Sequence, residues 1–294
     1  MRIDPQHARL LRLATGTALA VALILALAKA VAWWLSGSVS LLAGLTDSLL
    51  DGAASLLNLI AVNYALRPAD ADHRYGHGKA EALAGLGQAL FIGLSAGLVG
   101  VHGVERFLNP QPLSTPTLGV LVMLVSLLLT GALLAFQHRV VRITGSTAIR
   151  ADSLHYRSDL LLNGSILLAL VLASFGWPQV DALFGIAIAF FILWSAVGIA
   201  REACAVLMDQ ELAAELSQRM LLLACGVDGV VGAHDLRTRR SGMHWFVQLH
   251  VEIPGELSLQ QAHELCEQVE NAIRGEFAQA EVLVHADPLD VVRR

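Results

Sequence analysis

The sequence predicts an α-helical membrane protein with six transmembrane helices, followed by a cytoplasmic α+β domain. Composition is the first reason: of the 294 residues, 55% are hydrophobic and 15% are charged, and the mean hydropathy is +0.59. A typical soluble domain is about 45–50% apolar and about 25% charged, so this composition excludes a soluble enzyme. The second reason is that long apolar segments fill the chain up to about residue 203, after which polar and apolar residues mix. We therefore expect a membrane domain over residues 1–208 and a cytoplasmic domain over residues 209–294.

Six segments are apolar enough to cross a bilayer, which requires about 20 mostly apolar residues for each span. They cover residues 11–35, 39–66, 81–105, 116–138, 153–175 and 179–203. The first segment follows a polar N-terminus and has no small-residue cleavage site. We therefore interpret it as a retained span and not as a signal peptide.

Basic residues gather at the N-terminus and in the second and fourth connections between the spans. They are Arg2, Arg9, Arg12, Arg67, Arg74, Lys79, Arg139, Arg142 and Arg150, whereas the other connections hold only Arg106. Because basic loops favour the cytoplasmic side, this pattern predicts six spans with both termini in the cytoplasm. The net charge of −5 gives no indication of a nucleic-acid partner. The separate cysteines, Cys204, Cys225 and Cys266, form no CxxC pair and so predict neither a disulfide framework nor a thiolate zinc site.

Beyond residue 208 the sequence predicts the element order helix, strand, strand, helix, strand. The helices cover residues 212–226 and 258–277, and the strands cover 230–242, 244–255 and 280–290. Ser258 is placed to cap the second helix, with Gln261 three residues later as in a capping box. This order predicts a three-stranded sheet with both helices on one face.

Two pairs of ionisable residues lie within apolar segments that are far apart in the sequence. Asp47 and Asp51 are in the second predicted span and His155 and Asp159 in the fifth, each pair spaced i, i+4 and so on one face of a helix. A charge inside a membrane helix costs several kcal/mol, so its presence indicates a function. Three carboxylates and one imidazole can supply the four ligands of a divalent cation, and this set favours zinc, cadmium or ferrous iron over magnesium or calcium.

The depths of these two pairs do not match in ideal, untilted helices. Asp47 lies nearer the outer end of its span, whereas His155 lies near the inner end of its own. A shared site therefore requires the fifth helix to begin before residue 153 and to tilt. The alternative interpretation is that the four residues are polar helix ends, neutralised by protonation or by pairing with Lys29.

A second group of candidate ligands, Asp70, His73 and His77, follows the second predicted span. Their spacing of i, i+3, i+7 gathers the side chains if the segment is helical. Gly76 and Gly78 argue against a firm helix, and a solvated loop is the alternative.

A third group lies in the cytoplasmic domain. His285 and Asp287 are two residues apart on a predicted strand, so they share one face of the sheet. Two further histidines fall on the other strands and one on a helix, which completes the group His234, His250, His263, His285 and Asp287.

With these residues in place, the chain resembles the cation diffusion facilitator family, close to its bacterial zinc and ferrous-iron efflux branch. The similarity extends over essentially the whole chain. It is carried by the motifs LLAGLTDSLLDG, DADHRYGHGKAE, ADSLHYRSDLLLN, VGAHDLRTRRSG, VQLHVE, QAHELC and VLVHADP.

The resemblance implies a homodimer whose cytoplasmic domain is ferredoxin-like (metallochaperone-like), in a multi-pass protein of the bacterial inner membrane, in contact with lipid. It implies proton-coupled efflux of zinc, cadmium or ferrous iron by alternating access, with these ions as substrates and regulatory ligands and with no catalytic cofactor. It assigns Asp47, Asp51, His155 and Asp159 to the transport site. It assigns the second group to a loop site and the third group to a binuclear cytoplasmic site for regulation and dimerisation.

Metal binding requires a neutral imidazole and ionised carboxylates, so protons and metal compete for such a site. We therefore expect His155, Asp51 and Asp159 to couple transport to protons. A passive metal channel and a membrane-bound metal sensor are the alternatives. An enzyme is not expected, because no HExxH motif or nucleophile motif is present, and no GxxxxGK[ST] loop indicates ATP use.

Overall fold

The computed structural model describes residues 5–36, 39–108, 117–174 and 180–289. The chain divides into two compact units. The helical unit comprises Asp4–Arg67 and Ala80–Cys204, and the C-terminal unit comprises residues 205–294 together with Pro68–Lys79. The expected boundary after residue 208 stays a prediction. Arg2 and the connections at 37–38, 109–116 and 175–179 lie outside the described residues.

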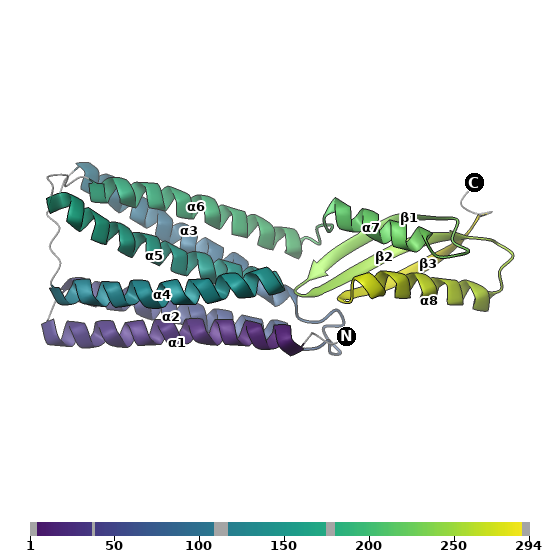
Figure 1. Cartoon of the computed structure of the whole chain (residues 1–294), viewed down its shortest axis with the longest axis horizontal. Coiled ribbons are helices and arrows are strands. Elements are labelled where there is room, and N and C mark those ends of the chain that lie inside the picture. The colour runs from purple at the N-terminus through teal and green to yellow at the C-terminus, as the bar shows by residue number, and fades with distance from the viewer. Residues whose placement is uncertain (1–4, 37–38, 109–116, 175–179, 290–294) are drawn as a thin grey trace. The chain divides into compact units, whose positions relative to one another are not determined.

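Six long helices form in the expected order (Figure 1). They are α1 (Pro5–Ser36), α2 (Val39–Ala65), α3 (Lys79–Leu108), α4 (Thr117–Thr144), α5 (Thr147–Ser174) and α6 (Val180–Leu207). Within the described residues, five of them are long and apolar enough to cross a membrane: α1, α2, α3, α4 and α6. The first half of α5 carries Arg150, Asp152, Arg157 and Asp159, and α5 is not among these five. The expected number of six spans is therefore not confirmed by length and composition.

A sharp break separates α4 from α5. Gly145 has a φ of +64°, a left-handed conformation that ends a helix readily, and its N–H donates to the Val141 carbonyl at 2.8 Å. The Ser146 hydroxyl then accepts from the N–H of Ile149 at 3.1 Å and caps the start of α5. The fifth helix therefore begins at Thr147, before residue 153, as a shared metal site between the second and fifth helices requires.

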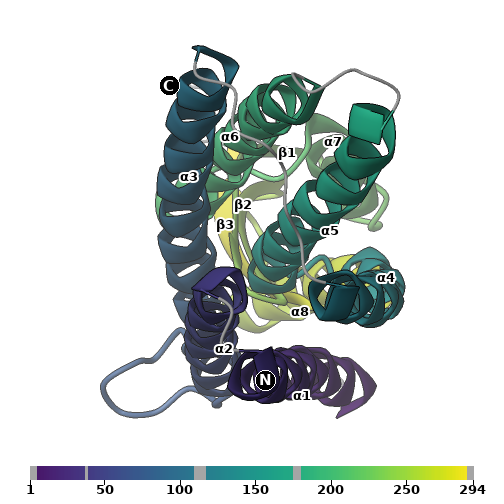
Figure 2. The same ribbon diagram turned by 90° about the vertical axis from the view of Figure 1, so that its left-hand side faces the viewer.

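Helix α5 lies between two groups of helices in the helical unit, as the end-on view in Figure 2 shows. On one side, α1 contacts α2 and α4, and α5 contacts α4 and α2. On the other side, small residues let α3 approach α6 closely: a Cβ on Gly103 would lie 2.9 Å from the Ile186 side chain. Apolar residues of α3, α5 and α6 share one buried cluster. Residues on successive turns of α5 can therefore face α2 or α3.

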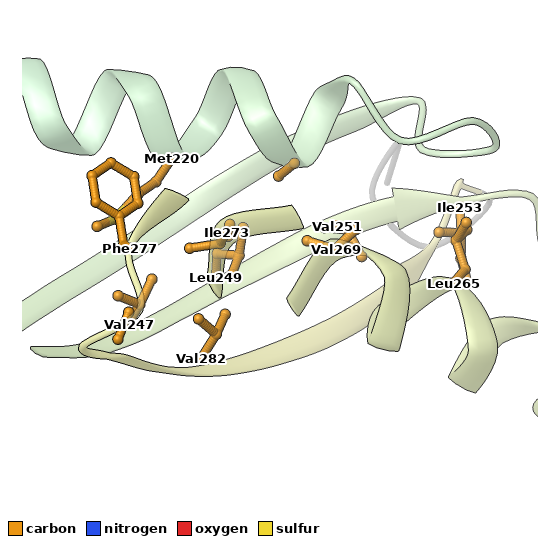
Figure 3. Packing of buried hydrophobic residues seen from close by; sticks show 12 residues of the cluster. Met220, Val247, Leu249, Val251, Ile253, Leu265, Val269, Ile273, Phe277 and Val282 are labelled. Atoms are coloured by element: carbon orange, nitrogen blue, oxygen red, sulfur yellow. The ribbon is translucent and has the colours of Figure 1, made fainter. Parts of the chain in front are cut away.

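The C-terminal unit is a three-stranded sheet with two helices on one face, as predicted. Its elements are α7 (Ala214–Cys225), β1 (Gly232–Ser241), β2 (His244–Ile253), α8 (Leu259–Glu276) and β3 (Ala280–Pro288). Strand β2 is central, antiparallel to β1 and parallel to β3. Alternate residues of β2, namely Val247, Leu249, Val251 and Ile253, point into the core with Val269 and Ile273 of α8 (Figure 3). The capping box of Ser258 and Gln261 at the start of α8 is confirmed.

Candidate metal sites

The α2 and α5 helices bring together three of the four residues expected to form the transport site. The Nε2 atom of His155 lies 2.8 Å from a carboxylate oxygen of Asp51 and 3.8 Å from one of Asp159. The ligand atoms of these three residues all lie within 4.8 Å of one another. The side chains of His155, Asp51 and Asp159 are 10%, 19% and 30% exposed, so the cluster is largely screened from its surroundings yet reachable by a small ion.

A buried tyrosine fixes the position of this cluster. The Tyr156 hydroxyl, next in sequence to His155, donates to the Ala18 carbonyl of α1 at 3.1 Å. Its oxygen lies 2.8 Å from the Ser55 hydroxyl of α2, which can donate to it. Because Tyr156 is 1% exposed, these bonds form in a low-dielectric interior, where they hold α5 against α1 and α2.

Asp47, the fourth expected ligand, lies outside the cluster. It is exposed, whereas Asp51 one turn later is half-buried. The difference in depth noted in the sequence accounts for this, because Asp47 is on the same helix face as Asp51 but about 6 Å further along the axis. The arrangement supplies three ligand groups directly and leaves a fourth nearby.

Sequence reasoning missed a second polar network, one turn earlier on the same face of α5. The Asp152 carboxylate is fully buried and accepts from the side-chain amides of Gln88 on α3, at 3.0 Å, and Gln137 on α4, at 2.6 Å. The three residues therefore join three helices one turn before His155. A charged residue in an apolar segment was the signal available for Asp152. That Gln88 and Gln137 contact it is visible only in the fold.

The loop group is brought together in a turn and not in a helix. Asp70 accepts from the backbone N–H groups of Asp72 and His73, and its two oxygens each lie 3.3 Å from a ring nitrogen, one of His73 and one of His77. The backbone hydrogen bond from His73 is the main reason that the pKa of Asp70 lies below its ordinary value. Asp70 and His73 are about half exposed, whereas the His77 side chain is 2% exposed.

This loop packs on the C-terminal unit. The Tyr75 ring meets the Phe246 ring edge-on at 5.3 Å, and the Arg239 guanidinium lies over both rings. Lys79 forms an ion pair of 2.9 Å with Asp209. The loop candidates are therefore attached to the same unit as the cytoplasmic candidates.

In the cytoplasmic group, three histidines form a row across the sheet. His250 of β2 is paired in register with His234 of β1 and with His285 of β3. Asp287 lies two residues beyond His285, and its carboxylate is 2.8 Å from His250, 3.3 Å from His234 and 3.2 Å from His285. The row is on the face of the sheet opposite the helices, because it alternates with the core residues of β2.

The surrounding histidines favour the ionised form of Asp287, which is the form that can bind a metal ion. Its partial burial opposes ionisation, but the hydrogen bond with His250 and the charges of His250, His285 and His234 outweigh this and lower its pKa. Glu252, which sequence reasoning did not select, lies 3.3 Å from His234. Its spacing of two residues from His250 on one strand was the signal for its position on this face.

His263 is not brought to this cluster within one chain. It lies on α8, where its side chain is 70% exposed and 3.5 Å from Glu267. Helix α8 covers the core face of the sheet, whereas the histidine row is on the other face. The assignment of His263 to the cytoplasmic site therefore stays a prediction.

Comparison with known proteins gives matches along the whole chain. The family described as cation efflux transmembrane domain matches residues 17–208, and the family described as cation efflux protein, cytoplasmic domain, matches residues 212–289. The chain is 49% identical over 290 residues to the cation-efflux pump FieF of Yersinia pestis (strain Pestoides F), which covers 99% of this chain and 97% of that protein. FieF of Yersinia pseudotuberculosis serotype O:3 (strain YPIII) matches to the same extent.

Among solved structures, MamM-CTD 215-293 is 31% identical and covers 25% of this chain and 95% of that chain, with a TM-score of 0.24. A variant of the same domain in a nickel form is 30% identical and covers 26% of this chain and 98% of that chain, with a TM-score of 0.25. The two family matches and the full-length relatives confirm the resemblance found in the sequence. The chain therefore belongs to the cation efflux family of membrane transporters, which are not enzymes.

Proposed function

We propose that this protein exports zinc, cadmium or ferrous iron from the cytoplasm in exchange for protons, by alternating access. The observation that carries the proposal is the contact of the His155 imidazole with Asp51 and Asp159 between two helices of the transport domain. Nitrogen combined with carboxylate oxygen favours these ions over magnesium or calcium. In this proposal α5 is the remaining transmembrane helix, which makes six spans in the bacterial inner membrane with both termini in the cytoplasm.

Proton coupling follows from the ligand chemistry. A divalent ion displaces protons from imidazole and carboxyl groups, and protons displace the ion in turn. Each elementary charge that crosses 100 mV is worth about 2.3 kcal/mol, so export of a divalent ion against an inside-negative potential is uphill by about twice that. One proton entering in exchange halves the electrical cost, and two remove it.

Asp47 completes the proposed site. Structural zinc sites are almost always tetrahedral with four ligands, and the cluster of Asp51, His155 and Asp159 provides three ligand residues. A small rotation or tilt of α2 brings Asp47 toward the ion. We infer that this movement accompanies metal binding and is part of the change in access.

The cytoplasmic site is proposed to be regulatory. His234, His250, His285 and Asp287 are placed to bind metal, and one of the solved relatives of this domain is a nickel form. In the proposed homodimer, metal at this face stiffens the pair of C-terminal units when cytoplasmic metal is high, and His263 has access to the site only from a second copy. Asp70, His73 and His77 form a further proposed loop site on the same unit.

The transport proposal is tested by metal flux in proteoliposomes with an imposed proton gradient. We expect saturable flux of zinc, cadmium or ferrous iron that follows the gradient and is abolished in Asp51→Ala and His155→Ala. His102→Ala is the matched control, because His102 is on α3, is 76% exposed and is separate from the cluster. Flux that persists in both site variants would remove the assignment of the site.

The same assay separates the alternatives. Flux that ignores the proton gradient would indicate a channel or uniporter. Metal binding without any flux would indicate a sensor. Regulation is tested separately with the His234→Ala, His285→Ala double variant, for which we expect the dependence of flux on cytoplasmic metal to weaken. An unchanged dependence together with an unchanged dimer would make the cytoplasmic site a passive feature.

A further inference from the structure

One cation of the protein itself lies inside the helical unit. Lys29 follows Arg12, the preceding basic residue of α1, by 17 residues, or about 26 Å along the helix. Its side chain is half-buried, and its ammonium group donates to the Ser48 hydroxyl of α2 at 2.7 Å. A lysine at this depth is costly, so it requires a partner of opposite charge or a function.

The surroundings of the Lys29 ammonium belong to the α2 half of the transport site. Ser48 follows Asp47 directly and precedes Asp51 by three residues. One turn earlier, a Cβ on Gly44 would lie 3.7–3.9 Å from the Lys29 Cδ, Cε and Nζ atoms, so the side chain lies along the bare backbone of α2. The ammonium group therefore lies beside the turn of α2 that carries Asp47 and Asp51.

A fixed positive charge beside a cation site has two opposite effects. It compensates the mutual repulsion of the carboxylates when no metal is bound, and it repels a divalent ion when metal is bound. A site that only had to hold metal would gain nothing from the second effect. A transport site does gain, since a tightly held ion leaves slowly.

We propose that Lys29 is the built-in counter-cation of the transport site, which stabilises the empty site and weakens its hold on the metal so that the ion can leave. The inference rests on the proposed transport function. Lys29 acts on the bound ion by charge, through space, and the Ser48 hydroxyl keeps the ammonium in place.

The test compares Lys29→Met, Lys29→Gln and Lys29→Arg in the full-length protein at one fixed pH. Equilibrium zinc binding is measured in detergent, and zinc flux against zinc concentration is measured in proteoliposomes. We expect Lys29→Met and Lys29→Gln to bind zinc roughly ten-fold more tightly, because one repulsive charge is removed. The KM for flux falls with the Kd, and the maximal rate falls because release slows.

The other variants separate charge from structure. Lys29→Arg keeps the charge and is expected to match the wild type in KM and maximal rate. Lys29→Gln keeps a hydrogen-bond donor for Ser48, so wild-type behaviour of this variant would show that the hydrogen bond and not the charge matters, which would overturn the proposal. Arg12→Met, which removes a cation of α1 about 26 Å from Lys29, is the matched control and is expected to leave zinc affinity unchanged.

Loss of maximal rate with unchanged or weaker zinc affinity in both neutral variants would also overturn the proposal, since a damaged fold produces that pattern. Failure of the transport function itself is recognised separately. In that case Asp51→Ala keeps the wild-type flux, whatever Lys29 variants do.

Discussion

Gly78→Ala is expected to detach the loop Pro68–Lys79 from the rest of the C-terminal unit. A Cβ at residue 78 would lie 2.4 Å from the carbonyl oxygen of Ser241 and 2.9 Å from the N atom of Gly242. Both contacts are with backbone, in a turn where Gly242 has a φ of +59°, so no flexible side chain can move aside. The loop must separate from the β1–β2 turn.

The size of the effect follows from the contacts that hold the loop. The described contacts include one aromatic pair, the Arg239 stack on both rings, and the Lys79 ammonium, which pairs with Asp209 and donates to the Leu207 carbonyl at 3.3 Å. Together they contribute about 1–3 kcal/mol, whereas a collision of this kind with rigid backbone costs at least as much. Undocking is therefore favoured over retention of the clash, while the core of the unit, which lies on the other face of the sheet, stays folded.

The assay is limited trypsin digestion of the purified full-length protein, with cleavage after Arg74 and Lys79 followed by mass spectrometry. Cleavage of a transiently open segment tracks its open population, so loss of about 1–3 kcal/mol predicts roughly 5- to 150-fold faster cleavage. Gly87→Ala on α3 is the matched control, because nothing lies within 4 Å of its Cβ. Wild-type cleavage rates in Gly78→Ala, or equal acceleration in both variants, would refute the reasoning.

Three further predictions concern stability, each measured on the full-length protein in detergent. Asp152→Ala leaves two buried glutamine amides without their acceptor, at about 1–3 kcal/mol each, and should lower the thermal midpoint, whereas an unchanged midpoint would mean that water replaces the carboxylate. Ile273 is fully buried in the C-terminal core, so Ile273→Ala should lower the free energy of unfolding of that unit by about 2–5 kcal/mol. The measurement is denaturant unfolding followed by the helical circular dichroism signal, and a loss below about 1 kcal/mol would contradict the packing. The hydrogen bonds from Arg219 hold the pKa of Glu276 below its ordinary value. This pair therefore stabilises the fold at pH values above the ordinary glutamate pKa of about 4.3. Its contribution to stability disappears as the pH falls through the lowered pKa. The gap in thermal midpoint between wild type and Arg219→Gln should therefore shrink from pH 7 to pH 3, and a gap that widens would have the wrong sign.

The candidate metal site between α2 and α5 was predictable to the extent that it depends on helix periodicity. Spacing of i, i+4 placed His155 and Asp159 on one face of α5, and Asp51 meets them there. The mismatch in depth between Asp47 and His155 was visible in the sequence, but whether helix tilt removes it depends on how α2 packs. The number of transmembrane spans had a similar limit, since the charged residues of α5 lower its hydropathy.

Contacts between distant segments were the other feature that the sequence could not supply. No local pattern indicates that Gln88 and Gln137 converge on Asp152, because the three residues come from three helices. Likewise, nothing in the loop sequence indicates that Tyr75 packs on Phe246. The break at Gly145 and Ser146 is different, because glycine at a helix end followed by a capping serine is a local signal that predicts the early start of α5.

The histidine row shows how the core of the C-terminal unit determines its candidate metal site. A shift of β2 by one residue would turn His250 into the core and Leu249 out to solvent. Burial of Leu249 and its alternate neighbours therefore sets the register that pairs His250 with His234 and His285. The ligands need no packing of their own to converge, since the apolar residues between them hold the three strands in place. A core substitution on β2 that changes the register should for this reason disrupt metal binding on the opposite face, even though it touches none of the ligands.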